Sequence, residues 1–206
     1  GGTARHPLPD LQGEGGAALT TDDNDRPATA RVARRHTAWF ALIALVVYLL
    51  DQASKAWALQ ALGDGLPREL LGRALRLVLV HNPGAAFSLG TGSTWLLTAL
   101  AVVIVAAVVR VSRRLASTGW TVALGLVLGG ALGNLTDRLI REPGVGRGHV
   151  VDFIDYNGWF VGNVADIAIV SAAGLIGILA LRGIGIDGTR ADERADTVAT
   201  EDATHD

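Results

Sequence analysis

The sequence predicts an all-α integral membrane protein with four transmembrane helices and a small extracytoplasmic β element between helices 1 and 2. Of the 206 residues, 50% are hydrophobic, and the mean hydropathy of +0.35 is higher than is usual for a soluble domain. The apolar residues are concentrated in residues 38–182, in runs separated by segments that contain Gly, Pro and Arg. We therefore expect residues 38–182 to form one membrane domain.

The two ends of the chain differ from this middle part. Residues 1–37 show no apolar periodicity, and residues 183–206 are acidic, so we expect both to be disordered cytoplasmic extensions. A cleaved signal peptide is the alternative for the first segment. It is disfavoured because Arg31, Arg34 and Arg35 precede an apolar stretch longer than the about 7–15 residues of a signal peptide core.

The first predicted span runs from Ala38 to Leu62. At a rise of about 1.5 Å per residue, this stretch exceeds the roughly 30 Å hydrocarbon core of a bilayer. Asp51 and Lys55 lie inside it at positions i and i+4, and Lys55 is the only lysine of the chain. Two interpretations stay open: the charged groups reach the membrane interface along their apolar stems, or the pair orients the groups of a functional site.

Residues 63–93 interrupt the hydrophobic pattern and predict an extramembrane strand and turn. The strand is Leu75 to Val80, and the turn is the Asn-Pro-Gly sequence from Asn82 to Gly84. Asn82 either simply starts the turn, which Asn commonly does before Pro-Gly, or contributes its amide to a site.

Three further apolar runs predict the remaining spans, which are Thr94 to Val111, Trp120 to Leu139 and Phe160 to Leu181. The third span carries glycines at a spacing of four, at positions 125, 129 and 133. Small residues at this spacing form a surface without side chains, so we expect another helix to pack closely against it.

The distribution of arginine predicts the orientation of the spans. Arginines precede the first span and also mark the turn after the second, at Arg110, Arg113 and Arg114. If these segments are cytoplasmic, both termini are inside, and residues 63–93 and 141–158 are outside. The arginines that oppose this assignment are Arg68, Arg73, Arg76, Arg141 and Arg147.

Polar residues gather at the predicted edge of the membrane, where an ionisable group is costly because it loses hydration. Asn134 precedes Arg138 by four residues and Asn163 precedes Asp166 by three, so on helices each pair would share a face. With the predicted topology, one site near the outer leaflet can contain Asp51, Lys55, Asn82, Asn134, Asp137, Arg138, Asp152, Asn163 and Asp166. Asp155 is a further carboxylate in the same region.

The residue types narrow the chemistry of this site. The chain has no cysteine, which excludes thiol nucleophiles and Cys-based metal sites. His149 has no oriented serine partner, and His81 and His149 are too few for a catalytic zinc site. Two aspartates in a low-dielectric pocket cannot both ionise easily, so one keeps a proton and the other acts as a base on water. Such a pair is suited to peptide hydrolysis without a covalent intermediate or a cofactor.

A proton-coupled carrier or channel and a structural adaptor are the alternatives from other classes. A carrier would show internal repeats and midplane charges, whereas these carboxylates cluster at one membrane face. An adaptor would have no reason to keep so many polar groups in the membrane. The formal net charge of -2 also argues against nucleic acid as a partner.

Five motifs together resemble the bacterial lipoprotein signal peptidases (signal peptidase II), in the same order along about residues 38–182. The motifs are Asp51-Gln-Ala-Ser-Lys55, Asn82-Pro-Gly84-Ala-Ala-Phe87, Gly133-Asn-Leu-Thr-Asp-Arg138, Val150-Val-Asp-Phe153 and Asn163-Val-Ala-Asp166. The set is highly specific, although it does not extend to the tails.

The resemblance implies a multi-pass aspartic peptidase of the bacterial cytoplasmic membrane, which cuts the signal peptide from diacylglyceryl-modified prolipoproteins just before the modified cysteine. It implies that Asp152 and Asp166 are the catalytic pair, that Asp137 and Asp155 are not catalytic, and that no metal takes part. Residues that would bind substrate or shape the site are Asp51, Lys55, Asn82, Gly84, Asn134, Arg138 and Asn163. We expect a monomer whose partners are prolipoproteins and membrane lipids.

Two features depart from the family pattern. The connection between Asp152 and Asp166 is short, and Gly162 stands where the family usually has an aromatic residue before the asparagine. A smaller lid over the site is implied, which leaves the substrate preference open.

Overall fold

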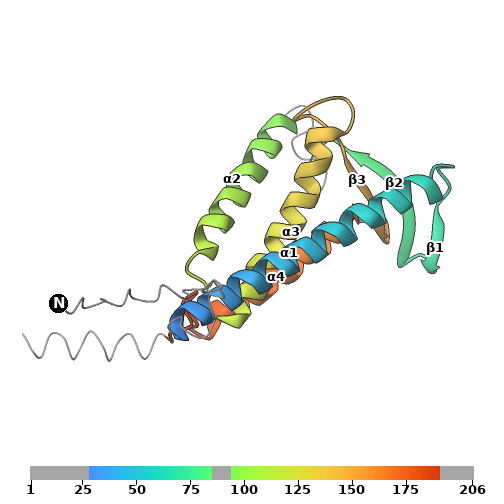
Figure 1. The fold of residues 1–206 in the computed structure, drawn as a ribbon. Helices are drawn as coiled ribbons and strands as arrows, with labels where there is room; N and C mark the ends of the chain where they lie inside the picture. Colours follow the sequence, from blue (N-terminus) through green and yellow to red (C-terminus); the bar gives the residue numbers. More distant parts are fainter. Residues whose placement is uncertain (1–27, 85–93, 191–206) are drawn as a thin grey trace, which may run out of the picture.

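The computed structural model describes residues 28–84 and 94–190, which form four helices and one small sheet (Figure 1). The helices are α1 (Ala28–Ala61), α2 (Thr94–Ser112), α3 (Thr118–Ile140) and α4 (Val164–Leu181). The described part of each helix is long and apolar enough to cross a membrane, with α1 contributing Arg34–Ala61. The predicted four-helix architecture is thus confirmed, although α1 begins well before Ala38.

The sheet is larger than predicted. It has four antiparallel strands in the order β1 (Arg68–Leu71), β2 (Leu75–Asn82), β3 (Val150–Tyr156) and β4 (Phe160–Gly162). The predicted strand between the first two helices is confirmed as β2, but the sheet also takes in β3 and β4 from the segment between α3 and α4, which were not predicted. The predicted start of the fourth span at Phe160 was wrong. Residues 160–162 are extended, and α4 begins at Val164.

The third helix is the centre of the bundle, because it packs against each of the other three. Three of its glycines allow α1 to approach closely, as predicted. A Cβ atom at Gly129 would overlap the Ala44 carbonyl oxygen of α1, one at Gly125 would overlap the Ile43 side chain, and one at Gly133 would overlap the Asp51 carboxylate. Gly130 has the same role toward α4, since its Cβ would lie 2.7 Å from the Ala165 carbonyl oxygen.

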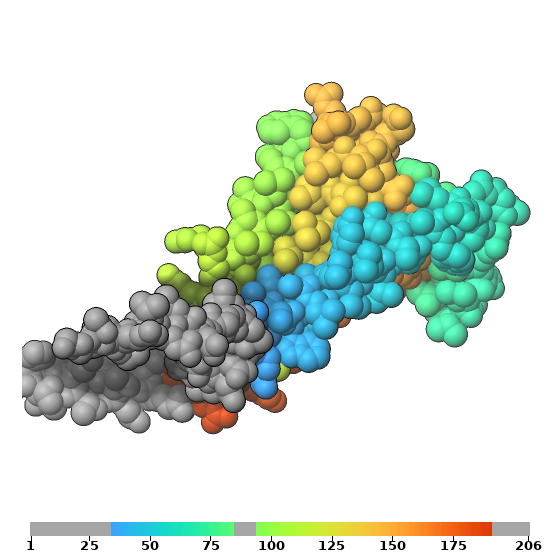
Figure 2. Space-filling model, viewed as in Figure 1, coloured from blue at the N-terminus to red at the C-terminus, as the bar shows by residue number. Residues whose placement is uncertain are grey.

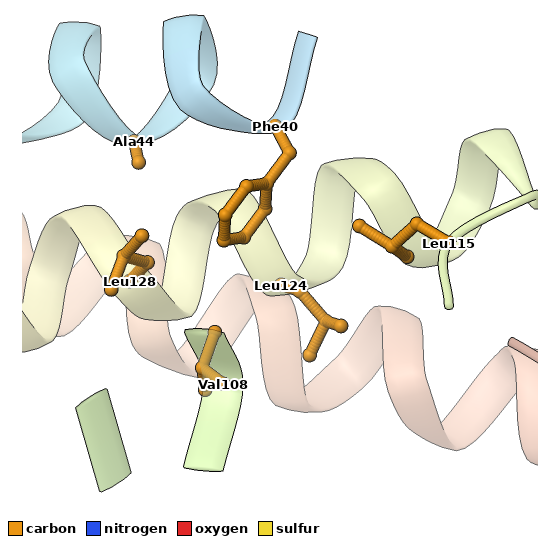
Figure 3. Packing of buried hydrophobic residues seen from close by; sticks show 6 residues of the cluster. All are labelled: Phe40, Ala44, Val108, Leu115, Leu124 and Leu128. Atoms are coloured by element: carbon orange, nitrogen blue, oxygen red, sulfur yellow. The ribbon is translucent and has the colours of Figure 1, made fainter. Parts of the chain in front are cut away.

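An apolar core fills the end of the bundle away from the sheet. Figure 3 shows its side chains from α1, α2 and α3 and from the turn between the last two, namely Phe40, Ala44, Val108, Leu115, Leu124 and Leu128. Many other large apolar side chains are exposed on the outer faces of the helices, including Leu49, Val103 and Val170. This pattern is that of a bundle surrounded by lipid.

The segment after α4 is ordered as far as Arg190, so the expected disordered tail does not begin at residue 183. The backbone N–H groups of Ala116 and Ser117 donate to the Ile186 carbonyl, and the Trp120 indole donates to the Ile184 carbonyl at 2.8 Å. These contacts attach the segment to the start of α3. The predicted disorder of residues 1–27 and 191–206 lies outside the described residues.

Candidate active site

Asp152 and Asp166 line one cavity of about 330 Å³. Asp152 lies on β3, where the alternation of side chains sends Val150 and Asp152 to the cavity and Val151 and Phe153 into a core with α1. Asp166 lies in the first turn of α4. The cavity is otherwise mostly apolar, with walls from α2, α3 and α4 formed by Leu97, Leu100, Ala101, Ile104, Val127, Ala131 and Ile169.

Asp152 is 2% exposed and is held by two amide groups. Asn82 Nδ2 donates to its Oδ2 atom at 2.8 Å, and Asn163 Nδ2 donates to its Oδ1 atom at 2.6 Å. Burial raises the pKa of Asp152 to about 6, and the nearby charge of Asp166 also raises it, while the two amide hydrogen bonds act in the opposite direction. This carboxyl is therefore poised to hold or release a proton near neutral pH.

Asn163 connects the two aspartates. It is the residue before α4, and it forms a capping box with Asp166: each side chain accepts a hydrogen bond from the other residue's backbone N–H, at 3.1 and 3.0 Å. The prediction that this pair shares a helical face was therefore wrong, because Asn163 caps the helix. The cap fixes the Asp166 carboxylate while the Asn163 amide reaches Asp152.

Lys55 anchors this arrangement from α1. Its Nζ atom contacts Asp51 Oδ2 and Asp137 Oδ2, both at 2.8 Å, and donates to Asn134 Oδ1 at 2.9 Å. All three ammonium donors thus have acceptors. Asn134 in turn donates to Asp166 Oδ1 at 3.1 Å. The Asp51–Lys55 ion pair was predicted, but both side chains are fully buried, so the interpretation that their charged groups extend to the interface was wrong.

Arg138 and Asn82 form one side of the cavity, and both interpretations of Asn82 hold. Its Oδ1 atom accepts from the Gly84 backbone N–H at 2.9 Å, which forms the turn, and its Nδ2 atom binds Asp152. Arg138 Nη2 donates to the Gly84 carbonyl at 2.7 Å. The arginine therefore fixes the position of the turn that carries Asn82.

Asp137 and Asp155 do not line the cavity, and each has a structural role that the sequence did not reveal. Asp137 accepts from Arg141 Nε at 2.6 Å and from the Val151 backbone N–H at 3.2 Å, which attaches β3 to α3. Asp155 accepts from Arg76 Nε at 2.9 Å and from the Gly158 backbone N–H at 2.6 Å, which fixes the turn between β3 and β4.

The two histidines that were weighed as metal ligands do not assemble such a site. Within residues 28–84 and 94–190, no group of three or more His, Cys, Asp or Glu side chains is arranged to hold a metal ion. His81 lies on β2, and His149 precedes β3.

Gly162 lies too close to neighbouring side chains to be replaced by a larger residue without a shift. A Cβ atom at this position would lie 2.6 Å from the Phe160 ring and 3.0 Å from Asp166 Oδ2. The Phe160 ring lines the cavity and stacks on Tyr156, with 6.0 Å between ring centroids. An aromatic residue two positions earlier in the chain thus covers the region beside Asp166, and no sequence signal indicated this role for Phe160.

We expect Gly162→Ala to lower the catalytic rate by up to about 100-fold. The added methyl group would displace the Phe160 ring or the Asp166 carboxylate, and small displacements of reacting groups have effects of this size. Gly174→Ala is the matched control on α4, since a Cβ there meets no atom within 4 Å. The comparison is kcat/KM for the two purified variants. Equal values would show that the close approach at Gly162 is unimportant.

Known proteins are similar to this chain in sequence and in fold. Residues 43–182 match the family described as signal peptidase (SPase) II. The chain is 50% identical to a lipoprotein signal peptidase of Leifsonia xyli subsp. xyli over 151 residues, which are 73% of this chain and 70% of the relative. It is 53% identical to the lipoprotein signal peptidase of Rhodococcus jostii over 149 residues, which are 72% of this chain and 75% of the relative.

A solved structure of a bacterial membrane enzyme has the same fold, with a TM-score of 0.62 and 30% sequence identity, over 69% of this chain and 87% of that one. The family match covers α2, α3, α4 and the sheet, together with α1 from Ile43 onward. It therefore includes every residue that lines the cavity or supports the two aspartates. On this evidence the chain belongs to the signal peptidase II family.

Proposed function

We propose that the protein is a membrane aspartic endopeptidase, which removes the signal peptide from prolipoproteins by cutting just before the diacylglyceryl-modified cysteine. One observation carries the proposal: Asp152 and Asp166 line the same cavity and are joined through the Asn163 amide. The family membership supplies the substrate class, and the two carboxylates supply the chemistry.

In the proposed mechanism, Asp152 and Asp166 share one proton, because two carboxylates in a poorly solvated site do not both ionise readily. The ionised member takes a proton from a water molecule, whose oxygen attacks the scissile carbonyl carbon. The protonated member donates to the carbonyl oxygen. The tetrahedral intermediate then collapses as a proton passes to the departing amine, so no covalent enzyme intermediate forms and no metal is needed.

The remaining cavity residues would position the substrate. The apolar walls from α2, α3 and α4 suit the acyl chains and the hydrophobic part of a signal peptide. The amides of Asn82 and Asn134 and the Arg138 guanidinium lie beside the two aspartates, where they could bind the extended backbone around the cleavage site. Asp51 and Lys55 do not line the cavity, and we assign them the role of holding Asn134 and the start of α4 in place.

We also propose that the enzyme is a monomer of the bacterial cytoplasmic membrane, with both termini in the cytoplasm and the site near the extracytoplasmic face. The arginines at the α2–α3 turn support this orientation. Reporter fusions after Ser117 and after Gly146 should report opposite sides of the membrane, with Ser117 inside. The same side for both fusions would contradict the four-span orientation.

The function is tested by mixing the purified protein in detergent with a prolipoprotein that carries the diacylglyceryl group on its cysteine, and with the same precursor lacking the lipid. We expect cleavage of the modified precursor alone, and mass spectrometry of the product should show the modified cysteine at its new amino terminus. A folded preparation that cleaves neither precursor would overturn the proposal.

A further inference from the structure

A second cavity lies at the end of α1 opposite the active site. It has a volume of about 300 Å³ and is lined by residues of α1 and α3, namely Arg35, His36, Trp39, Ile43, Thr118, Thr121 and Val122. His36 and Lys55 both belong to α1 and are about 28 Å apart along its axis, at the helical rise per residue. This cavity is therefore separate from the one that holds the two aspartates.

His36 presents a free nitrogen to this cavity. The ring is 6% exposed, and its Nδ1 atom lies 2.9 Å from Thr121 Oγ1. Because the Thr121 hydroxyl proton is donated to the Ser117 carbonyl at 2.8 Å, Nδ1 is the donor toward Thr121. No described residue pairs with Nε2. Among the described residues, every side-chain nitrogen or oxygen that is fully enclosed has a hydrogen-bond partner. Because Nε2 has none, it is not enclosed, and it is accessible from the cavity that His36 lines.

The surroundings favour an anion with an apolar portion. The described residues at this end include a single carboxylate, Asp187, and the arginines Arg35, Arg110, Arg113, Arg114 and Arg182. Arg34 and Arg190 are also at this end but have partners of their own. Trp39 is 54% exposed, as is typical of tryptophan at the membrane interface. Leu42 and Val46 continue an exposed apolar face along α1 toward the middle of the bundle.

We propose that this cavity binds the phosphate headgroup of an anionic glycerophospholipid from the adjacent leaflet. Arg35 and, in the imidazolium form, the Nε2–H group of His36 would donate to the phosphate oxygens. The acyl chains would follow the exposed apolar face of α1. Basic pockets between transmembrane helices are common binding sites for anionic headgroups. Trp39, Ile43 and Val122 give the cavity an apolar wall, which favours a lipid over a free phosphate ion. The proposal does not depend on the peptidase activity.

The test measures binding of phosphatidylglycerol and phosphatidylcholine to the full chain in a neutral detergent, by native mass spectrometry and by the shift of the thermal unfolding midpoint. We expect preferential retention of phosphatidylglycerol. Arg35→Gln should weaken this binding about five-fold, which corresponds to the contribution of one basic residue near an anionic surface. In His36→Asn the amide N–H replaces the imidazole Nδ1–H donor toward Thr121 but nothing replaces Nε2, so this variant should also bind the lipid more weakly. His36→Gln, whose amide reaches the position of Nε2, should bind it better than His36→Asn does.

Arg114→Gln is the matched control, because Arg114 is exposed at the same end but does not line the cavity. The affinity of Arg114→Gln for phosphatidylglycerol should stay within about two-fold of the parent's affinity, because an exposed charge is screened by salt. The proposal is overturned if the parent shows no preference for phosphatidylglycerol, or if Arg114→Gln weakens binding as much as Arg35→Gln. It is also overturned if inorganic phosphate stabilises the protein as well as the lipid does, since the occupant would then be a small anion.

Discussion

Asp152→Asn and Asp166→Asn should each lower the cleavage rate by at least about 100- to 10,000-fold, which is the usual contribution of general acid–base catalysis. Asparagine has nearly the same shape as aspartate but neither accepts a proton from water nor donates one to the carbonyl oxygen. The measurement is single-turnover cleavage of the diacylglyceryl-modified precursor. Both variants should stay folded but with a lower thermal unfolding midpoint than the parent, because the asparagine oxygen keeps one of the two hydrogen bonds that each carboxylate accepts, while its NH2 group faces the second donor.

The control for this experiment must be an aspartate without a structural role. Asp155 is only three residues from Asp152, but it is buried and fixes the β3–β4 turn through Arg76 and Gly158, so its replacement would disturb the site indirectly. Asp64 is exposed and contacts only its own loop and Arg68. Asp64→Asn should therefore keep full activity. Activity that survived Asp152→Asn and Asp166→Asn would remove both residues from the mechanism.

Lys55→Met should destabilise the protein by about 3–5 kcal/mol, the usual effect of removing one partner of a buried ion pair. Methionine retains the length of the side chain but leaves the Asp51 and Asp137 carboxylates buried without their shared cation. It also removes the donor to Asn134, which contacts Asp166. Denaturant unfolding in detergent micelles measures the stability, and activity should fall together with it.

The Asp64–Arg68 pair provides the matched control, because it has the same i, i+4 spacing but its side chains are about half exposed, at 46% and 51%. Surface pairs contribute about 0–1 kcal/mol, so Arg68→Met should have little effect on the free energy of unfolding. If Lys55→Met were as harmless as Arg68→Met, the network around Lys55 would not support the site.

Much of the fold could be predicted because hydropathy and helix length depend on local sequence. The second and third spans match α2 and α3 to within a few residues. The sheet was underestimated because β3 depends on pairing with β2, a partner about 70 residues away, and periodicity within a short segment does not reveal such a partner. For the same reason Phe160 was assigned to a helix, although it belongs to β4.

The sequence indicated residues that the fold brings close together, but it did not indicate most of the contacts between them. Spacing brought Asp51 and Lys55 together correctly, since both lie on one helix. The spacing of three residues gave the wrong prediction for Asn163 and Asp166. The same spacing occurs between two residues on one face of a helix and between a helix cap and its partner in the first turn, and Asn163 is a cap. The ion pairs of Asp137 with Lys55 and of Asp155 with Arg76 connect distant segments, so residue spacing does not predict them. Without the family resemblance, the sequence would not have separated these two carboxylates from Asp152 and Asp166.

The proton shared by Asp152 and Asp166 is tested most directly by the pH dependence of kcat/KM, measured with and without a chelator. Burial raises the pKa of Asp152 to about 6, so the pair keeps its proton at a higher pH than two solvated carboxyls would. We expect a bell-shaped profile: the rate falls at low pH, when both carboxyls are protonated, and it falls again at higher pH, when the shared proton is lost. The chelator should have no effect. A kcat/KM that rises steadily with pH would contradict the aspartate mechanism. So would an activity that the chelator abolishes and zinc restores.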